Sequence, residues 1–316
     1  MKSFQNIKDA KFENAWVTIG SFDGVHIGHQ AVIKGLVQAA HAAGNPAVAV
    51  TFYPLPAVVL KNIHEPYYLT DRQECTELLS SLGLDAVITM KFDHALANLS
   101  VDDFIHLLIK HLGMRQLWVG EGFTLGKDRQ GTIAYLQSES KKLKFLVKQN
   151  EIIEVDEKAV SSSQIRTLIT NGGVDVAAEL LGRPYRMTGK VVHGIGRGHK
   201  LGIPTANLEV PKEKLLPGIG IYATWLWWER KRFPSVTNIG FRPTFETKQT
   251  FPLVEPYIMD FDQDLYGEQL TVEFLKYLRP EEKFDSAEQL VNKIREDIQQ
   301  AQEVFTNAPR TPGLSA

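Results

Sequence analysis

The chain has very few of the features that cross-link a protein or hold it in a membrane. Its 316 residues include a single cysteine, Cys75, which excludes an internal disulfide and suits a reducing compartment. Its most apolar stretch, at residues 218–233, is too short to span a bilayer. The first residues also lack the apolar core of a signal peptide. We therefore expect a cytoplasmic protein with no membrane segment.

The chain also lacks an excess of either charge. Lys and Arg number 35 and Asp and Glu number 37, so the formal net charge is -2. A balance of this kind creates no global field that would attract nucleic acid or an anionic membrane surface. We expect small molecules as partners, and neither nucleic acid nor membrane. The composition makes no prediction of the oligomeric state.

Strand-like and helix-like segments alternate over the first half of the chain. Strands are expected at residues 15–20, 46–52, 84–90 and 114–123, and helices at 29–44, 70–83 and 100–113. Gly44 is the expected end of the first helix, and Ser100 is the expected cap of the third. Thr70 with Gln73 resembles a capping box for the second. This alternation predicts an α/β domain with a parallel sheet covered by helices, in which ligands bind beyond the carboxyl ends of the strands.

The pattern changes after about residue 183. Strand-like segments follow one another at residues 189–194, 221–228, 233–240, 253–261 and 270–278, separated by turn signals. They predict an antiparallel sandwich or small barrel. One helix, at 286–305, closes this half, with Asp285 or Ser286 as its cap. We therefore expect a domain at 1–183, a second at 184–306, and a disordered tail at 307–316.

One short stretch, GSFDGVHIGH at residues 20–29, concentrates unusual residue types between the first strand and the first helix. Its glycines allow a tight turn and a close approach to a ligand, and a helix start attracts anions. His26 and His29 add two donors that suit a triphosphate whose α-phosphorus is attacked. For an isolated pair of this spacing, a turn histidine and a surface histidine are the simpler interpretation. A zinc site is another interpretation, but the two histidines have no carboxylate or cysteine partners at the spacing of metal ligands.

Two further segments of the first half combine hydroxyls or cations with a helix start. VGEGFTLGKDRQG, residues 119–131, places Lys127 and Arg129 between a strand and a helix. VSSSQIR, residues 160–166, places serine hydroxyls at a helix start and Arg166 in the first turn. Both arrangements are typical of phosphate binding.

The second half contains one glycine-rich stretch, GKVVHGIGRGHKLGIPTANLEV, at residues 189–210. Gly194, Gly196 and Gly198, with Arg197 among them, could wrap phosphates through backbone N–H groups. The stretch is not a dinucleotide-binding fingerprint, because His199 stands where that pattern has its last glycine and no helix follows. On composition alone a hairpin loop is the default interpretation.

Together these motifs resemble those of bifunctional bacterial riboflavin kinase/FMN adenylyltransferases, also called FAD synthetases. GSFDGVHIGH resembles the nucleotidyltransferase signature, and the segments at 119–131 and 160–166 are similar to others of the adenylyltransferase half. PTANL, VTNIGFRPTF, LVEPYIMDFDQDLYG and LRPEEKFDSAEQL follow in the order of the riboflavin kinase domain. The resemblance covers nearly the whole chain. It implies a Rossmann-like nucleotidyltransferase domain, followed by a small antiparallel β-barrel with a terminal helix.

The resemblance also implies a function and its chemistry. Riboflavin would be phosphorylated to FMN with ATP, and FMN would be adenylylated to FAD with a second ATP, releasing pyrophosphate. Glu255 matches the family's general base, Thr205 and Asn207 match its Mg²⁺ ligands, and His26 and His29 match catalytic positions of the adenylyltransferase half. The flavin-binding residues are left unassigned. The expected ATP- and phosphate-binding residues are Gly20, Phe22, Asp23, Gly24, Lys127, Arg129, Ser162, Ser163, Arg166, Gly194, Gly196, Arg197 and Gly198.

Four positions depart from the family pattern. Leu55 stands where a histidine is usual, Gly122 where Asp or Asn is usual, and Gln164 where Arg is frequent. In the kinase half, Tyr257 replaces a frequent histidine. The losses at 55 and 122 motivate an alternative: a monofunctional riboflavin kinase whose N-terminal domain binds nucleotide or flavin without adenylylating.

Overall fold

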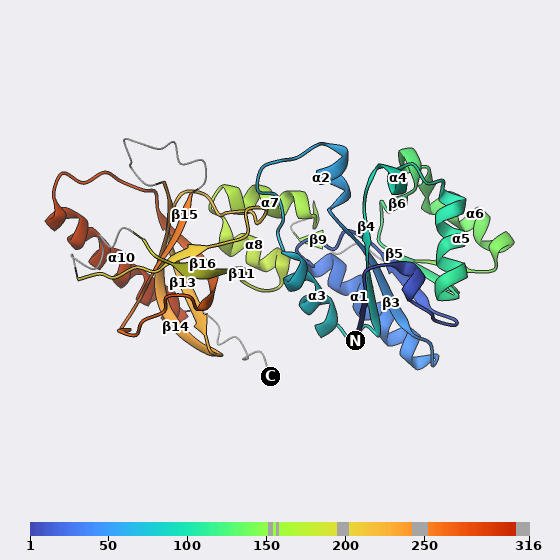
Figure 1. The fold of residues 1–316 in the computed structure, drawn as a ribbon, viewed down its shortest axis with the longest axis horizontal. Coiled ribbons are helices and arrows are strands. Elements are labelled where there is room, and N and C mark those ends of the chain that lie inside the picture. Colours follow the sequence, from blue (N-terminus) through green and yellow to red (C-terminus); the bar gives the residue numbers. More distant parts are fainter. Residues whose placement is uncertain (151–153, 156–157, 195–201, 242–251, 308–316) are drawn as a thin grey trace. The chain divides into compact units, whose positions relative to one another are not determined.

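The computed structural model describes residues 1–150, 154–155, 158–194, 202–241 and 252–307. The chain forms two compact units, residues 1–163 and 164–316, each of which we describe by itself (Figure 1). The division falls inside a helix, about twenty residues before the expected domain boundary at 183/184. The expected disordered tail lies almost wholly outside the described residues.

The first unit is built on a six-stranded sheet in which every pairing is parallel, as predicted. The strand order is β1-β4-β3-β2-β5-β8. The bounds are β1 Lys2–Phe4, β2 Trp16–Ile19, β3 Ala47–Tyr53, β4 Ala86–Lys91, β5 Gln116–Val119 and β8 Leu146–Gln149. The two edge strands, β1 and β8, were not expected from the sequence. They are short and largely exposed, so they lack the buried apolar run that marks the inner strands.

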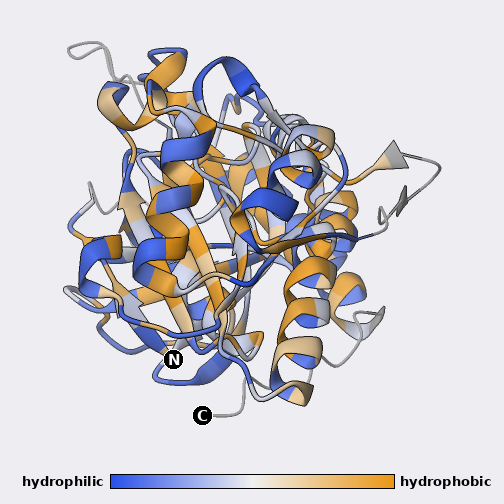
Figure 2. Cartoon of the chain, turned by 90° about the vertical axis from the view of Figure 1, so that its right-hand side faces the viewer, coloured by the Kyte–Doolittle hydropathy of each residue, from blue (hydrophilic) through white to orange (hydrophobic). Residues whose placement is uncertain are grey.

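Helices cover both faces of this sheet (Figure 1). Alternate residues of the inner strands face opposite ways. Val48 and Val50 pack with α5 (Val101–Leu112) and α6 (Ile133–Leu143), whereas Ala47 and Ala49 pack with α1 (Ile27–Ala42) and α3 (Arg72–Ser81). Figure 2 shows helices that carry hydrophobic and hydrophilic residues together, as expected for helices with one buried face. The bounds of the helices are η1 Ile7–Asp9, α1 Ile27–Ala42, α2 Pro56–Leu60, α3 Arg72–Ser81, α4 His94–Ala97, α5 Val101–Leu112, η2 Lys127–Arg129 and α6 Ile133–Leu143. Two small hairpins complete the unit: β6 Thr124–Leu125 with β7 Gly131–Thr132, and β9 Glu154–Val155 with β10 Lys158–Ala159.

The helix caps confirm one sequence prediction and overturn another. Ser100 caps α5, its side chain accepting the backbone N–H of Asp103. The predicted capping box of Thr70 and Gln73 is wrong, because Asp71 is the cap of α3 and accepts the backbone N–H of Glu74. The Thr70 hydroxyl is used elsewhere, in the loop before α1.

The second unit contains a closed antiparallel barrel, so the barrel prediction is confirmed over the sandwich. The strand order around it is β11-β12-β15-β14-β13-β16. Alternation along the strands places Tyr222 and Leu226 of β13 with Val272 and Phe274 of β16 among the fully buried residues. The bounds are β11 Tyr185–Val192, β12 Asn207–Glu209, β13 Gly220–Trp228, β14 Lys231–Gly240, β15 Leu253–Ile258 and β16 Gln269–Arg279.

Helices accompany the barrel at both ends of its sequence. α7, Ser162–Thr170, and α8, Val174–Leu181, precede it, and α8 packs against β11 and β16. α10, Ala287–Asn307, follows it and contacts β13, β14 and β16. Ser286 caps α10, because its hydroxyl accepts the Gln289 N–H. The Arg279 guanidinium binds the buried Asp297 carboxylate through two nitrogens at 2.7 and 2.8 Å, which fixes α10 to β16.

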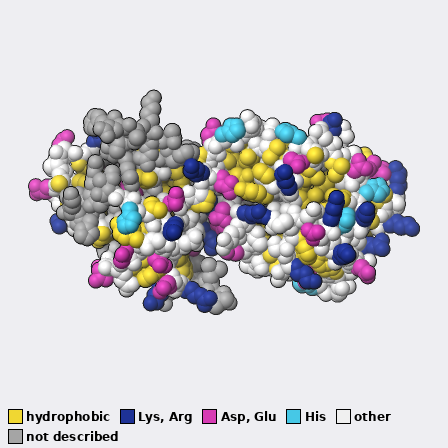
Figure 3. Space-filling view, in the orientation of Figure 1, with side chains coloured by type: hydrophobic (Ala, Val, Ile, Leu, Met, Phe, Trp, Pro, Cys, Tyr) yellow, Lys and Arg dark blue, Asp and Glu magenta, His cyan; other side chains and the backbone are white. Residues whose placement is uncertain are grey.

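The surface reflects the balanced composition. On the face drawn in Figure 3, acidic and basic side chains are interspersed among the described residues. Within the described part of the chain, no helix is long and apolar enough to cross a membrane.

Candidate active sites

The first candidate site begins where β2 ends and the chain turns into α1. Gly24 has a φ of 81°, and Phe22 and Val25 also have positive φ, of 46° and 40°. Residues that carry a Cβ adopt this region at a cost, and such strain persists only where surrounding contacts hold it. The loop at residues 20–26 therefore depends on its neighbours for its shape.

The segment before α3 holds this loop through Asp23. The buried Asp23 carboxylate accepts the backbone N–H groups of Leu69 at 3.0 Å and Thr70 at 3.1 Å. The Thr70 hydroxyl also donates to this carboxylate, and it accepts the N–H of Gly24 at 3.1 Å. These contacts show Asp23, predicted as a phosphate-site residue, in a role that shapes the loop.

Two other segments hold the same loop. The Ser162 hydroxyl, at the start of α7, donates to the Asp23 carbonyl at 2.8 Å. The Thr51 hydroxyl, on β3, donates to the Ser21 carbonyl at 3.1 Å. Segments that are remote in sequence therefore meet at this loop, at the carboxyl end of the sheet.

His26 and His29 come into contact at the start of α1. His26 is the cap residue, and its Nδ1 accepts the backbone N–H of His29 at 3.4 Å. Their rings stack with centroids 3.6 Å apart and planes inclined by 22°, and the Phe22 ring meets His29 edge-on. Gly28 leaves room for this stack, because a Cβ there would lie 3.2 Å from two atoms of the His26 ring. The imidazole pair thus lies at the positive end of the helix dipole.

His29 is held in its neutral form. Burial, and then the charge of His26, lower the pKa of His29 well below its ordinary value of 6.5. Its Nδ1 is buried and has no hydrogen-bond partner among the described residues. A buried imidazole nitrogen without a partner is destabilising unless a ligand supplies one. This nitrogen therefore suits a ligand that reaches the start of α1.

The expected phosphate residues of α7 begin next to this loop. Besides the bond from Ser162 to Asp23, the Val160 carbonyl lies 3.9 Å from the position that a Cβ of Gly28 would take. Ser163 follows Ser162, and Arg166 lies half-buried one turn further along α7. The structure thus places the start of α7 beside the start of α1.

Lys127 and Arg129 lie in the β6–β7 hairpin, which the sequence predicted only as a loop between strand and helix. Both side chains are exposed. The hairpin packs against the start of α5: the Lys127 N–H donates to the Leu99 carbonyl, and a Cβ at Gly126 would lie 2.7 Å from Val101. Among the described residues, no interaction joins these two cations to the histidine pair.

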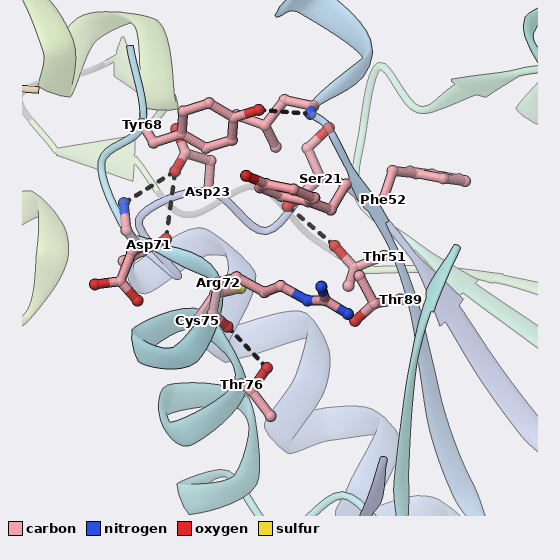
Figure 4. Close-up of a pocket in the computed structure, with 13 residues that line it drawn as sticks. Ser21, Asp23, Thr51, Phe52, Tyr68, Asp71, Arg72, Cys75, Thr76 and Thr89 are labelled. Carbon is pink, nitrogen blue, oxygen red and sulfur yellow. Dashed lines mark hydrogen bonds between the residues drawn. The ribbon is translucent and has the colours of Figure 1, made fainter. Parts of the chain in front are cut away.

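A small hollow lies at the carboxyl ends of β2, β3 and β4 (Figure 4). In Figure 4 the Arg72 side chain extends from α3 toward Thr89, with hydroxyls of neighbouring strands around it. Arg72 also lies over the Tyr53 ring, 5.6 Å from its centroid, and forms no ion pair with any described residue. This cation is not recognisable from the sequence, because nothing there marks an arginine in the first turn of a helix as facing a pocket. The lining residues are Ser21, Asp23, Thr51, Phe52, Tyr53, Leu55, Tyr68, Thr70, Asp71, Arg72, Cys75, Thr76 and Thr89.

The second candidate site is a row of polar side chains on the outside of the barrel. Leu208 pairs with Val254, and Thr205 pairs with Tyr257, so counting along the strands puts Asn207 opposite Glu255. On its other side, Glu255 pairs with Asn238 of β14. Side chains opposite one another on adjacent strands have Cβ atoms about 5 Å apart. Antiparallel pairing thus brings together three predicted residues, Thr205, Asn207 and Glu255.

Gly194 supports this row from the end of β11. Asn207 is 8% exposed, and a Cβ at Gly194 would lie only 2.3 Å from its Nδ2. Only glycine fits there without displacing the Asn207 amide. The other predicted residues of this loop, Gly196, Arg197 and Gly198, lie outside the described residues.

Comparisons with known proteins agree on both halves. A family model described as FAD synthetase matches residues 8–164, and one described as riboflavin kinase matches residues 181–305. The bifunctional riboflavin kinase/FMN adenylyltransferases of Haemophilus influenzae and Bacillus subtilis are each 35% identical over 92% of this chain, covering 94% and 92% of their own lengths. The Escherichia coli protein of the same name is 33% identical over 96% of this chain and 97% of its own.

The chain belongs to the bifunctional riboflavin kinase/FMN adenylyltransferase family. A crystal structure described as a macrolide-efflux protein from Streptococcus pneumoniae covers 97% of the chain with a TM-score of 0.85 and 30% identity, and itself is covered to 99%. That likeness extends the agreement to the fold of both units.

The structure places three of the four departures from the family's motifs, at positions 55, 122 and 257. Leu55 is the N-cap residue of α2 and is buried, so an apolar side chain fits there. Its backbone N–H donates to the Tyr68 hydroxyl at 3.2 Å. Gly122 has a φ of 70° and open space where a Cβ would be. Tyr257 pairs with Thr205 beside the row of the second site. None of the three breaks the histidine pair or the polar row.

Proposed function

We propose that the protein phosphorylates riboflavin to FMN at the barrel row and adenylylates FMN to FAD at the histidine pair. The observation that carries the proposal is the convergence of separate motifs at each place, in a chain whose two halves match the two family models. The monofunctional alternative is not favoured, because the FAD synthetase match and the stacked histidines are both present.

In the adenylylation step, a phosphate oxygen of FMN attacks the α-phosphorus of ATP, and the bond to pyrophosphate breaks. The FMN phosphate is already ionised at neutral pH, so no general base is needed. We assign His26 and His29 to stabilising the charge that develops on the phosphoryl oxygens and on pyrophosphate. A neutral His29 serves as a hydrogen-bond donor there, which fits its lowered pKa.

Several residues bind the phosphates around that step in our proposal. Backbone N–H groups of the loop at 20–24 and the start of α1 supply fixed donors. Lys127, Arg129 and Arg166 supply cations, and Ser162 and Ser163 lie at the start of α7. Arg72 suits an anionic part of the substrate nucleotide in the hollow of Figure 4, beside the Tyr53 ring.

In the phosphorylation step, the ribityl 5′-hydroxyl of riboflavin attacks the γ-phosphorus of ATP, and the bond to ADP breaks. Glu255 takes the hydroxyl proton as general base, a role that typically contributes about 10²–10⁴-fold. Its place between Asn207 and Asn238 supports this assignment, because neutral neighbours on both strands leave it as the one carboxylate of the row.

We assign Mg²⁺ to Thr205 and Asn207. Both offer neutral oxygens, and the Asn207 amide is held in place against Gly194. Among the described residues there is no group of three or more His, Cys, Asp or Glu side chains that could hold a metal ion. A cation that takes most of its ligands from ATP phosphates and water fits such a donor set. Bound there, Mg²⁺ would neutralise charge on the transferred phosphoryl group.

The location of the protein is a further part of the proposal. A single cysteine and small-molecule substrates suit the cytoplasm. The balanced charge gives no support for a nucleic-acid partner.

Chromatography of the products after incubation with riboflavin, ATP and Mg²⁺ tests the proposal. We expect FMN to form first and FAD to follow. Formation of FMN alone would contradict the adenylylation half and support the monofunctional alternative. Absence of both products would contradict the whole assignment.

A further inference from the structure

Asn238 is a member of the barrel row that has no part in the proposed phosphoryl transfer. It lies on β14 and pairs directly with Glu255 of β15. Since Asn207 lies opposite Glu255 on the other side, Asn238 flanks the proposed base from the strand that carries no proposed metal ligand. Its side chain therefore faces the place where the attacking hydroxyl must lie.

The orientation of the Asn238 amide is determined by its partner. Its Nδ2 donates to Oε1 of Glu281 at 3.2 Å. A carboxylate only accepts hydrogen bonds, so the NH₂ group and not the carbonyl must face Glu281. The amide oxygen, Oδ1, is thereby turned to the other side.

Glu281 is an exposed residue just after β16, and its carboxylate occupies space that Gly240 leaves open. A Cβ at Gly240 would lie 1.8 Å from Oε1 of Glu281 and 2.3 Å from its Cδ. Any larger residue at 240 would displace the carboxylate. The end of β14 thus provides the space in which Glu281 can hold Asn238.

The amide oxygen that results is buried and without a hydrogen-bond partner among the described residues. Buried acceptors are rarely left unpaired, and an unpaired one at a site calls for an explanation. An acceptor needs a donor, and the proposed substrate carries a ribityl chain whose hydroxyl groups can each donate a hydrogen bond. The 5′-hydroxyl donates to Glu255 in the proposed mechanism, so a neighbouring hydroxyl is free to donate to the next strand.

We propose that Oδ1 of Asn238 accepts a hydrogen bond from a ribityl hydroxyl other than the one that is phosphorylated, with Glu281 holding the amide in that orientation. Asn238 is then a substrate-binding residue and Glu281 a positioning residue. Together they select flavins that carry a hydroxylated side chain. The inference rests on the proposed placement of riboflavin at Glu255.

The test measures flavin binding rather than turnover, by quenching of flavin fluorescence with Mg²⁺ and a non-hydrolysable ATP analogue present. The ligands are riboflavin and lumiflavin, which has a methyl group in place of the ribityl chain. We expect Asn238→Leu to weaken riboflavin binding about tenfold or more, or about 1.4 kcal/mol. Lumiflavin binding should be unchanged. Glu281→Gln, whose amide can accept or donate, should weaken riboflavin binding less.

Three outcomes would overturn the inference. If Asn238→Leu bound riboflavin as tightly as the wild type does, the proposed hydrogen bond to the ribityl chain would not exist. Equal weakening for riboflavin and lumiflavin would make Asn238 a structural residue. A change confined to the Mg²⁺ concentration needed for binding would make it part of the metal site. Two controls check that Asn238→Leu is folded. FMN adenylylation by this variant shows whether the first unit is intact, and thermal melting shows whether the barrel is.

The variant Glu255→Gln separates this inference from the proposed function. If it keeps full kinase activity, the base assignment fails, while the binding measurements on Asn238 remain decisive. If it loses activity but binds riboflavin normally, the base assignment holds whatever Asn238 does.

Discussion

The two sites of this protein are assembled in opposite ways. In the first unit the proposed catalytic groups lie in one continuous stretch, residues 20–29, and the rest of the unit serves to hold that stretch in shape. In the barrel the proposed catalytic and substrate-binding groups come from three strands, β12, β14 and β15, which meet only because the barrel closes in one register. A motif that is continuous in the chain can be recognised in the sequence. A row of side chains on different strands is apparent only in the folded structure.

The difference has a consequence for what each site tolerates. The loop at residues 20–26 has strained backbone angles and depends on hydrogen bonds from remote segments. The row on the barrel depends on strand register, in which a slip of one residue would turn Glu255 to the inside. In both sites, removing a proposed catalytic side chain should therefore reduce the reaction rate most. Disturbing the residues that hold it in place should reduce the rate less.

The largest effect should come from Glu255→Gln, which removes the proposed base and keeps the shape of the side chain. Riboflavin phosphorylation should fall by about 10²–10⁴-fold, while FMN adenylylation stays at the wild-type rate. Initial rates of FMN formation and of FAD formation check this. Glu273→Gln, another half-buried outward glutamate, on β16, is the matched control and should keep kinase activity. A kinase that survives Glu255→Gln would contradict the assignment.

The next largest effect should come from His29→Ala. It removes a donor at the start of α1, so FMN adenylylation should fall by about 10²–10³-fold with riboflavin phosphorylation unchanged. His41→Ala, at the exposed far end of the same helix, is the control. If both variants lost the same fraction of activity, the effect would lie in helix stability and not in the histidine pair.

A smaller effect is expected from Gly194→Ala, which removes none of the proposed functional side chains. The added Cβ would displace the Asn207 amide, so the concentration of Mg²⁺·ATP needed for half-maximal kinase rate should rise by about tenfold. Gly120→Ala, where the nearest atom is 3.9 Å away, tests a tolerated change of the same kind. An unaltered kinase would show that Asn207 need not lie where the structure places it.

The smallest effect concerns stability and pH. His29 has a lowered pKa in the folded state, whereas in the unfolded chain it takes up a proton near pH 6.5. Below that pH the unfolded state binds more protons, so stability falls as the pH falls from about 7 to about 5. Urea unfolding of the first unit should show this slope, and His29→Asn should reduce it. An identical slope in both proteins would mean that His29 titrates normally in the folded state.

The sequence predicted both folds, and the elements that it missed have physical causes. The inner parallel strands and the barrel strands were visible because buried runs and alternation are local patterns. β1 and β8 were missed because short exposed edge strands lack such patterns. The capping box at Thr70 was wrong because Asp71 competed for the cap, and Thr70 was needed by Asp23.

The arrangement of a candidate site can be predicted from the sequence where its residues are close together in the chain. It is harder to predict where folding brings distant residues together. His26 and His29 are three residues apart, so a helix start suffices to bring them together. Asn238 and Arg72 were not singled out because their roles depend on register and on a pocket that only tertiary structure makes. Asp23 was assigned to phosphate, and its hydrogen bonds to Leu69 and Thr70 became visible only in the folded chain.

The central claim is that two separate sets of residues perform the two reactions, and a mixing experiment tests it most directly. Riboflavin, ATP and Mg²⁺ are given to Glu255→Gln alone, to His29→Ala alone, and to both together. We predict no FMN from the first, FMN with little FAD from the second, and FAD from the mixture. FAD at the wild-type rate from either variant alone, or none from the mixture, would contradict the account.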